Sequence, residues 1–268
     1  MDLKLNGKRV LVTGGASGIG DAIVRTFAEE GAVPVSVDIN AAGLERQHAA
    51  LAERGAESAY IVADLSTQEG VERVVAEGAG IFGSAPDVIV NNVGSGSLRT
   101  LIETSDEDFH RTLELNLFAM VRICKAFLPA MQDAGGGAVV SVTSDLSRQP
   151  EDSITDYAAS KAAVASVAKS LARLYAPTIR VNCVAPGPIY TPFWSDEKYG
   201  WQKTVEGAYG KEGTAALDAL IEDRGIPMAR MGTPEEVGAA VAFLASEVSG
   251  FTTGATLGVD GGSIRALF

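Results

Sequence analysis

Tyr157 and Lys161 stand four residues apart in a stretch whose composition is typical of a helix. That spacing places both side chains on one helix face. There the lysine ammonium would lower the pKa of the phenol, which is ordinarily near ~10. Such a tyrosine can exchange a proton with an alcohol or a carbonyl group near neutral pH. The pair is a common chance pattern by itself, but Ser144, thirteen residues upstream at the end of an apolar run, adds a hydroxyl beside it.

A glycine-rich loop, Thr13–Gly20, follows the first apolar run. Glycines let a backbone turn sharply and approach a pyrophosphate at the positive end of the following helix. The spacing is Gly-x-x-x-Gly-x-Gly rather than the general Gly-x-Gly-x-x-Gly fingerprint. Asp38 ends the second apolar run, where a carboxylate can bind the ribose hydroxyls of NAD and repel the 2′-phosphate of NADP. Because neither Ser17 nor Ile39 supplies a positive charge, the sequence favours NAD.

Apolar runs alternate with helical patterns along most of the chain. This alternation predicts a Rossmann-type, doubly wound α/β fold, a parallel sheet of about seven strands with helices on both faces. The expected strands are Arg9–Thr13, Val33–Asp38, Ala59–Ala63, Asp87–Asn91, Ala138–Val142, Ile179–Val184 and Thr256–Val259. The clearest helices are Gly20–Glu30, Gln68–Phe82, Phe109–Met131 and Thr155–Tyr175.

No repeat or change of composition divides the 268 residues, so we expect a single dinucleotide-binding catalytic domain, 1–268. Only residues 188–225 break the alternation; they carry several glycines and aromatic residues, including both tryptophans, Trp194 and Trp201. A long, irregular segment in a compact α/β domain is more often a functional lid than a connector. We therefore predict a substrate lid. The alternative is that its aromatic side chains are buried against the scaffold or an oligomer neighbour.

The composition excludes several other classes of protein. A net charge of −12 argues against binding to nucleic acid. Two distant cysteines, Cys124 and Cys183, and two isolated histidines, His48 and His110, form no disulfide framework and no metal-ligand spacing. No apolar run approaches the length of about eighteen residues that predicts a membrane helix, and the first apolar run is too short for a signal peptide. We expect a cytoplasmic protein without a metal.

The motifs, and their order along the chain, resemble those of the short-chain dehydrogenase/reductase family, in its compact single-domain branch. The resemblance covers nearly the whole chain. The likeness rests on Thr13–Gly20, Asp64–Leu65, Asn91–Gly94, Asn116, Ser144, Tyr157, Lys161, Pro186–Thr191 and Val259–Gly262. Val93 replaces the alanine of the family's Asn-Asn-Ala-Gly element. The resemblance implies cofactor contacts from Gly14, Ser17, Gly18, Ile19, Gly20, Asp38, Asp64, Leu65, Asn91, Gly94, Tyr157, Lys161, Pro186, Gly187, Ile189 and Thr191.

The resemblance also implies a reaction, hydride transfer between NAD(H) and a secondary alcohol or ketone. Tyr157 would be the acid and base, and Ser144 would hydrogen-bond the substrate oxygen. Lys161 would hold the nicotinamide ribose and lower the phenol pKa, and Asn116 would pass the proton onward through a water. The alternatives are an NADP-dependent ketone reductase and a non-catalytic dinucleotide-binding sensor.

Two further expectations concern the substrate and the assembly. The aromatic segment favours a hydrophobic or cyclic alcohol, because its few lysines (Lys198, Lys203 and Lys211) are balanced by acidic residues. The family likeness implies a homotetramer joined through the long helices Phe109–Met131 and Thr155–Tyr175.

Overall fold

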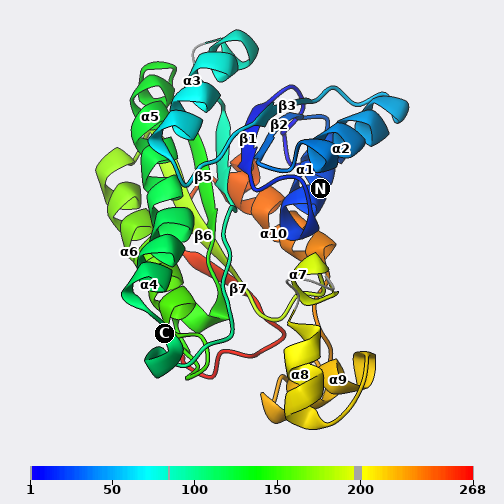
Figure 1. Cartoon of the computed structure of the whole chain (residues 1–268). Coiled ribbons are helices and arrows are strands. Elements are labelled where there is room, and N and C mark those ends of the chain that lie inside the picture. Colours follow the sequence, from blue (N-terminus) through cyan, green and yellow to red (C-terminus); the bar gives the residue numbers. More distant parts are fainter. Residues whose placement is uncertain (1, 84, 196–200, 268) are drawn as a thin grey trace.

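A seven-stranded parallel sheet forms the centre of the computed structural model, which describes residues 2–83, 85–195 and 201–267 (Figure 1). The strands are β1 (Arg9–Thr13), β2 (Val33–Asp38), β3 (Ala59–Val62), β4 (Val88–Asn91), β5 (Gly137–Val142), β6 (Ile179–Pro186) and β7 (Thr256–Val259). Their order in the sheet is β3-β2-β1-β4-β5-β6-β7, and every neighbouring pair is parallel. The winding direction reverses between β1 and β4, so a crevice opens beyond the carboxyl ends of these strands.

Helices cover both faces because the strands are apolar on both sides. On β1, Val10 and Val12 pack into one core, whereas Leu11 packs into the other. The first core lies under α1 (Gly18–Glu29), α2 (Ala41–Glu53) and α10 (Pro234–Ala245), and the second under α3 (Gln68–Phe82), α5 (Ala119–Asp133) and α6 (Thr155–Tyr175). The predicted fold class is confirmed, and the predicted strand ends lie within two residues of those observed.

The helix expected at Phe109–Met131 is interrupted. It consists of α4 (Asp106–Leu113), a π-helical turn (Glu114–Phe118) and α5. In the π turn the N–H of Ala119 donates to the carbonyl of Glu114, five residues back. Such turns often occur at functional sites. Here the turn carries Asn116, one of the predicted site residues.

The segment 188–225 is largely helical, which corrects the expectation of an irregular stretch. It contains α7 (Pro192–Ser195), α8 (Gln202–Tyr209) and α9 (Thr214–Asp223); its residues 196–200, with Lys198 and Tyr199, lie outside the described part of the chain. α8 and α9 pack on one another around Val205 and Leu217 and stand beyond the end of the sheet (Figure 1). Gly210 ends α8 and Gly213 precedes α9, so these two glycines mark helix ends and do not belong to a long loop.

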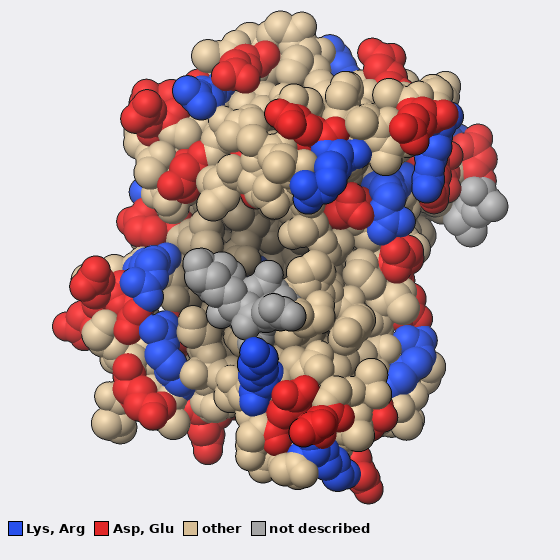
Figure 2. All heavy atoms as spheres, turned by 45° about the vertical axis from the view of Figure 1, so that its right-hand side comes forward, with Lys and Arg blue, Asp and Glu red and all other residues tan. Residues whose placement is uncertain are grey.

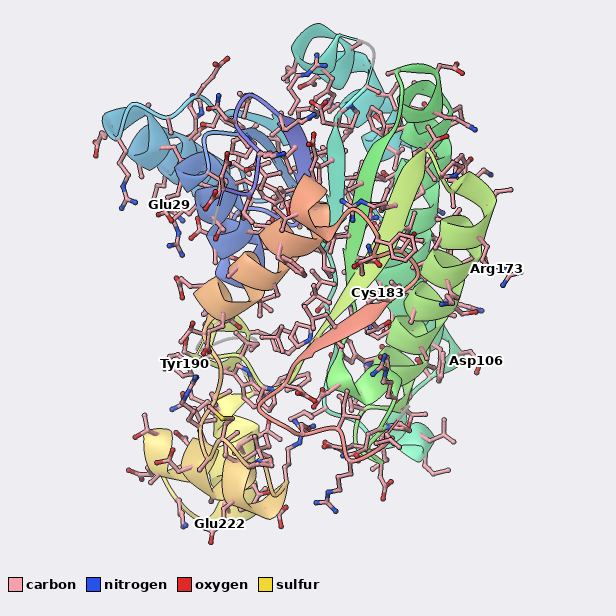
Figure 3. The ribbon with its side chains drawn as sticks, turned by 180° about the vertical axis from the view of Figure 1, so that it is seen from behind. Glu29, Asp106, Arg173, Cys183, Tyr190 and Glu222 are labelled. Carbon is pink, nitrogen blue, oxygen red and sulfur yellow. The ribbon has the colours of Figure 1, made fainter. Side chains whose placement is uncertain are left out.

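Most charged residues lie on the outer surface, but Asp145, Asp156 and Lys161 are buried, as are the two cysteines. Viewed from behind, Glu29, Asp106, Arg173 and Glu222 point outward, whereas Cys183 lies inside on β6 (Figure 3). None of the described helices is long and apolar enough to cross a bilayer. The described residues also contain no cluster of three or more histidine, cysteine or carboxylate side chains placed to hold a metal ion.

Candidate active site

A cavity of about 1130 Å³ opens at the carboxyl ends of the strands. It is large for a small-molecule site, since such pockets usually measure roughly 300–1,000 Å³. Figure 2 shows it as a hollow in one face, lined mostly by uncharged atoms, with charged side chains of both signs around the rim. All the predicted site residues except Asn91 and Asn116 line this cavity.

The glycine loop closes one end of the cavity and is held by the strands beside it. The N–H groups of Gly14 and Gly15 donate to the carbonyl of Val37 at 2.7 and 3.2 Å. The amide of Asn92 donates to the carbonyls of Thr13 and Gly14, both at 3.0 Å. These bonds fix the loop at the start of α1, where backbone N–H groups can meet an anion.

At two positions of the loop only glycine fits, because neighbouring backbone atoms lie where a Cβ would be. Gly14 has a φ of +67°, and a Cβ there would lie 2.9 Å from the Cα of Val93. A Cβ on Gly20 would lie within 2 Å of the carbonyl oxygen of Gly14. Side chains at these positions would fill the space between loop, helix and β4. The bare backbone therefore forms a cradle that fits the pyrophosphate of a dinucleotide.

Asp38 lies at the end of β2, at the edge of this cradle. One carboxylate oxygen accepts from the N–H of Ala16 at 3.1 Å and the other from the N–H of Asn40 at 3.0 Å. Its carboxylate is thus tied to the glycine loop and still lines the cavity. The next residue, Ile39, is 69% exposed and carries no charge.

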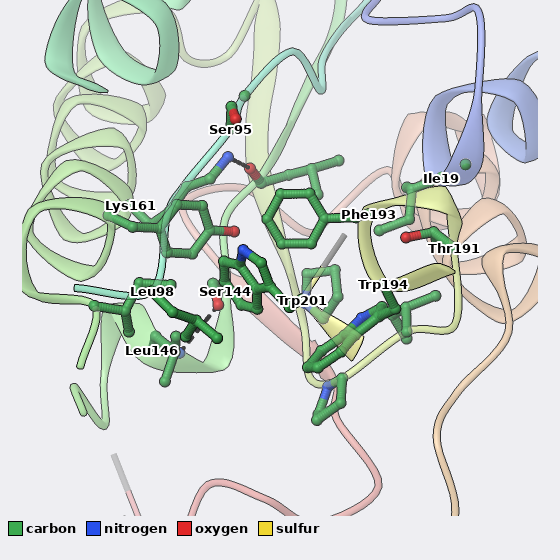
Figure 4. Close-up of a pocket in the computed structure, with 18 of the residues that line it drawn as sticks. Ile19, Ser95, Leu98, Ser144, Leu146, Lys161, Thr191, Phe193, Trp194 and Trp201 are labelled. Carbon is green, nitrogen blue, oxygen red and sulfur yellow. Dashed lines mark hydrogen bonds between the residues drawn. The ribbon is translucent and has the colours of Figure 1, made fainter. Parts of the chain in front are cut away.

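Ser144, Tyr157 and Lys161 come together on the opposite wall, from the end of β5 and the first turns of α6. The Lys161 ammonium lies 5.7 Å from the centre of the Tyr157 ring, as four-residue spacing on a helix predicts. It also donates to the carbonyl of Val142 at 2.9 Å. The Ser144 hydroxyl accepts from the N–H of Leu146 at 3.2 Å (Figure 4).

The expected drop in the phenol pKa does not occur in the protein alone. Burial raises the pKa of Tyr157 to about 12, and the negative charge of Asp145 adds to the rise, while the Ser144 hydroxyl acts in the opposite direction. Burial also lowers the pKa of Lys161 to about 8, against the influence of Cys183. Desolvation is the largest cause at both groups, and Lys161 is not among the groups that shift the pKa of Tyr157.

Asn91 and Asn116 lie outside the cavity wall. Side chains alternate along a strand, so Asn91 points to the α5 side, where its amide nitrogen lies 3.6 Å from the sulfur of Cys124. Its neighbour Asn92 lines the cavity instead. The Asn116 amide binds both backbone groups of Ser95 and the hydroxyl of Ser160, each at 2.9 Å. It holds the loop after β4, and its expected role in a proton relay stays a prediction.

The segment 188–225 supplies an aromatic wall. The rings of Phe193 and Trp201 are tilted by 56° with their centres 4.4 Å apart, and Trp194 meets Trp201 edge-on at 5.4 Å. In Figure 4 Trp201 lies beside Ser144, Leu98 and Leu146, whereas Phe193 and Trp194 lie toward Ile19 and Thr191. The sequence analysis predicted a substrate lid from this composition, and closure of the segment over a substrate stays a prediction.

Sequence reasoning missed a group of charged residues at the outer end of the cavity. The group comprises Asp145, Glu151, Arg224 and Arg265. Asp145 could have been found, because it directly follows Ser144. Arg224 and Arg265 come from distant parts of the chain, and no spacing in the sequence connects them with the site.

The fold and this geometry define a nucleotide-dependent oxidoreductase site. The family model described as enoyl-(acyl carrier protein) reductase matches residues 14–263. The chain therefore belongs to the short-chain dehydrogenase/reductase family. It is an oxidoreductase that transfers a hydride between a nicotinamide cofactor and an alcohol or a ketone.

The particular relatives act on different compounds. The chain is 37% identical to D-threitol dehydrogenase of Mycolicibacterium smegmatis, over 97% of this chain and 94% of that protein. It superposes on L-sorbose reductase from Gluconobacter frateurii, complexed with NADPH and L-sorbose, with a TM-score of 0.92, 34% identity and full coverage of both chains. It also resembles a 7α-hydroxysteroid dehydrogenase complexed with NADH, with a TM-score of 0.86, 29% identity and coverage of 100% and 98%. These two solved structures thus hold different cofactors, NADPH in one and NADH in the other.

Proposed function

We propose that this protein is an NAD-dependent dehydrogenase acting on a hydrophobic or cyclic secondary alcohol, or on the matching ketone. The observation that carries the proposal is the arrangement of Ser144, Tyr157 and Lys161 between a dinucleotide cradle and an aromatic wall. The residues fit a dinucleotide, which when bound supplies the hydride donor or acceptor. The protein then has to hold the substrate oxygen and move one proton.

In this proposal Tyr157 takes the hydroxyl proton during alcohol oxidation and returns it during ketone reduction. Ser144 hydrogen-bonds the substrate oxygen. Lys161, held by the carbonyl of Val142, faces both the phenol and the cavity and would bind the cofactor ribose. Its positive charge, with that of the oxidised cofactor, would counteract the effect of burial on the phenol pKa. Asn116 links the loop after β4 to α6, because it binds the backbone of Ser95 and the hydroxyl of Ser160.

Asp38 supports NAD rather than NADP. A 2′-phosphate would meet a carboxylate whose position is fixed by Ala16 and Asn40. Among the described residues, the basic side chains that line the cavity are Arg99, Lys161, Arg224 and Arg265, and none of them is on the β2 edge. Charge repulsion without a compensating base should cost NADP roughly two decades of affinity.

The substrate class is inferred from the wall around Tyr157. Leu98, Leu146 and Ile154 pack near Tyr157 and Trp201, which favours an apolar ring or chain. A second candidate is a sugar alcohol, because Glu151 and Arg224 line the outer end of the same cavity. Among the relatives, one is named for the sugar alcohol D-threitol and another for the sugar L-sorbose.

One panel tests these proposals together. Cyclohexanol, 2-octanol, D-threitol and D-sorbitol are offered with NAD or NADP, and reduced cofactor is followed by absorbance. We expect cyclohexanol with NAD to give the highest kcat/KM. A polyol preferred over cyclohexanol would refute the apolar substrate, and equal rates with NADP would refute the cofactor proposal. Asp38→Ala should narrow the difference between the cofactors, and Glu45→Ala, on the same side but outside the cavity, should leave it unchanged.

We also propose a homotetramer, as the family likeness implies. Phe118, in the π turn, is 41% exposed, and Leu174, on α6, is 70% exposed. Apolar side chains this exposed on two long helices suit a subunit contact. A cytoplasmic location stays a prediction.

A further inference from the structure

Asp145, the residue after Ser144, joins three distant segments of the chain. One of its oxygens accepts from the Ser144 hydroxyl at 3.1 Å and from the N–H of Leu146 at 2.9 Å. The other accepts from Arg224 at 2.9 Å and from the Ser263 hydroxyl at 2.7 Å. Arg224 caps the end of α9, and Ser263 follows β7. The residue beside the predicted catalytic serine is thus bound to both the lid and the C-terminal segment.

The pair between Arg224 and Asp145 differs from the surface ion pairs of this protein. Their side chains are only 13% and 4% exposed. Arg224 uses a second guanidinium nitrogen to bind Glu151 at 2.8 Å. Exposed pairs contribute little, whereas removing one partner of a buried pair leaves a poorly solvated charge. A planar guanidinium can serve two carboxylates at once, as a lysine cannot.

The contact with Ser144 has a chemical consequence. A serine hydroxyl has one hydrogen to donate, and here it is directed at Asp145. To hold a substrate oxygen, Ser144 must release Asp145. A carboxylate that is already bound by Arg224 and Ser263 has less negative charge to offer, so it competes less strongly for that hydrogen.

We propose that Arg224 is a positioning residue that acts through Asp145: it fixes the end of the lid on the Ser144 loop and neutralises the carboxylate, so that Ser144 and Tyr157 can act on the substrate. The proposal rests on the roles given above to Ser144 and Tyr157. It assigns the lid a second task besides covering the substrate, which is to bring a positive charge to the active site.

The pH profile of alcohol oxidation distinguishes this role from a merely structural one. Oxidation needs the Tyr157 phenolate, so the rate rises as pH passes the pKa of Tyr157. Asp145 raises that pKa. Without Arg224, the charge of Asp145 would be less neutralised, and the rising limb of the profile (the pH range in which kcat for oxidation increases) would move to higher pH. Asp145→Asn removes that negative charge and would move the rising limb to lower pH. Of the other charged groups nearby, Lys161, Asp223, Arg265 and the Arg99–Asp156 pair are the same in both variants. Glu151 differs, because Arg224→Gln removes its guanidinium partner; the freed carboxylate adds negative charge and acts in the same upward direction.

The experiment measures kcat against pH with NAD and the best alcohol of the panel above. We expect Arg224→Gln to lower kcat at least tenfold and to shift the rising limb of kcat upward by about 0.5–1 pH unit. Asp145→Asn should shift the rising limb downward by a similar amount. NAD affinity should stay within twofold in both. Arg230→Gln is the matched control, because Arg230 pairs with Glu236 on the exposed surface, and it should behave as wild type.

Three results would overturn the proposal: an unshifted limb in folded Arg224→Gln, shifts of both variants in one direction, or the same shift in Arg230→Gln. Circular dichroism and melting temperature establish folding. If Arg224→Gln does not fold, Arg224→Lys replaces it, and its limb should move upward by a smaller amount. Tyr157→Phe distinguishes failure of the proposed function from failure of the role of Arg224. If Tyr157→Phe is active, the proposed function is wrong. If Tyr157→Phe is inactive and the pH profile of Arg224→Gln is unshifted, only the role of Arg224 is wrong.

Discussion

At Tyr157 two opposing effects act on the phenol. Burial favours the neutral form and raises the pKa to about 12, whereas the neighbouring lysine would favour the phenolate. The lysine has a reduced pKa of about 8 and so loses its charge as the solution becomes alkaline. At neutral pH the phenol of the protein alone therefore stays protonated, and in the proposed mechanism its activation would depend on the positive charge of the bound, oxidised cofactor.

This balance predicts the pH dependence of the two directions. Alcohol oxidation needs the phenolate and should become faster as pH rises from about 7 toward the raised pKa of Tyr157. Ketone reduction needs the protonated phenol, which is present below that pKa, and should show no such rise. Initial rates in both directions over one pH series provide the measurement. A reduction rate that rose with pH alongside oxidation would contradict the assignment of Tyr157.

Substitution at Tyr157 tests its role directly. Tyr157→Phe removes the proton donor and little binding surface, so turnover should be abolished and NAD affinity should stay within about tenfold. Ser144→Ala should also reduce kcat strongly. Ser141→Ala is its control, because Ser141 is buried on β5 and does not line the cavity. Cofactor titration by fluorescence beside steady-state kinetics separates the two effects.

At the scale of helices, strands and loops, the loop after β4 packs against Tyr157 at the start of α6. A Cβ on Gly96 would lie 2.8 Å from Cδ2 of Tyr157, closer than carbon atoms approach. Gly96→Ala should therefore displace the ring and lower kcat roughly 10²-fold, since small misplacements of reacting groups are costly. Wild-type kcat in this variant would show that the phenol position is not critical.

The matched control is Gly80→Ala. Gly80 lies in α3, where an added Cβ would meet nothing within 4 Å. Alanine favours a helix over glycine, so this variant should keep its activity and gain roughly 0.5–1 kcal/mol in the free energy of unfolding. Thermal unfolding of both variants provides the stability measurement.

The two tryptophans of the predicted lid have different surroundings. Trp194 is 7% exposed and packs on Val205 and Leu217 within the lid. Trp201 contacts that cluster and also the one that contains Leu146. Trp194 is thus buried mainly within its own segment rather than against the scaffold, and both tryptophans also line the cavity.

We expect Trp201→Ala to raise KM about tenfold with NAD affinity unchanged, because it removes an apolar wall at the substrate. Trp194→Ala should mainly lower the melting temperature, because it opens a cavity inside the lid. Steady-state kinetics and melting curves of both variants distinguish a substrate contact from a packing role. A Trp201→Ala enzyme with normal KM and a large loss of stability would refute its place in the substrate site.

At the scale of the whole molecule, the proposed tetramer has a simple test. Leu174→Glu would place a charge in the proposed α6 contact and should reduce the molecular mass measured by light scattering. Ile102→Glu is the control, because Ile102 is 94% exposed but lies outside the long helices, in the short 3₁₀ turn Leu101–Glu103. If Leu174→Glu keeps the wild-type mass, the contact lies elsewhere.

The sequence by itself determined the fold class and most of the site. Apolar runs fix the strands of a parallel sheet because both faces must be buried, and glycine spacing fixes a cradle because only a bare backbone can approach so closely. The four-residue interval sets Tyr157 beside Lys161 because both lie on one helix. These features are local, and each is encoded within a short stretch of chain.

Only the tertiary structure decided how segments far apart in the chain meet. It placed Arg224 and Ser263 on Asp145, turned Asn91 toward α5, and engaged the Asn116 amide with Ser95 and Ser160. It also decided the pKa of Tyr157, because burial depends on everything that packs around the phenol. Desolvation and long-range ion pairs are properties of the assembled fold, and no interval along the sequence reports them.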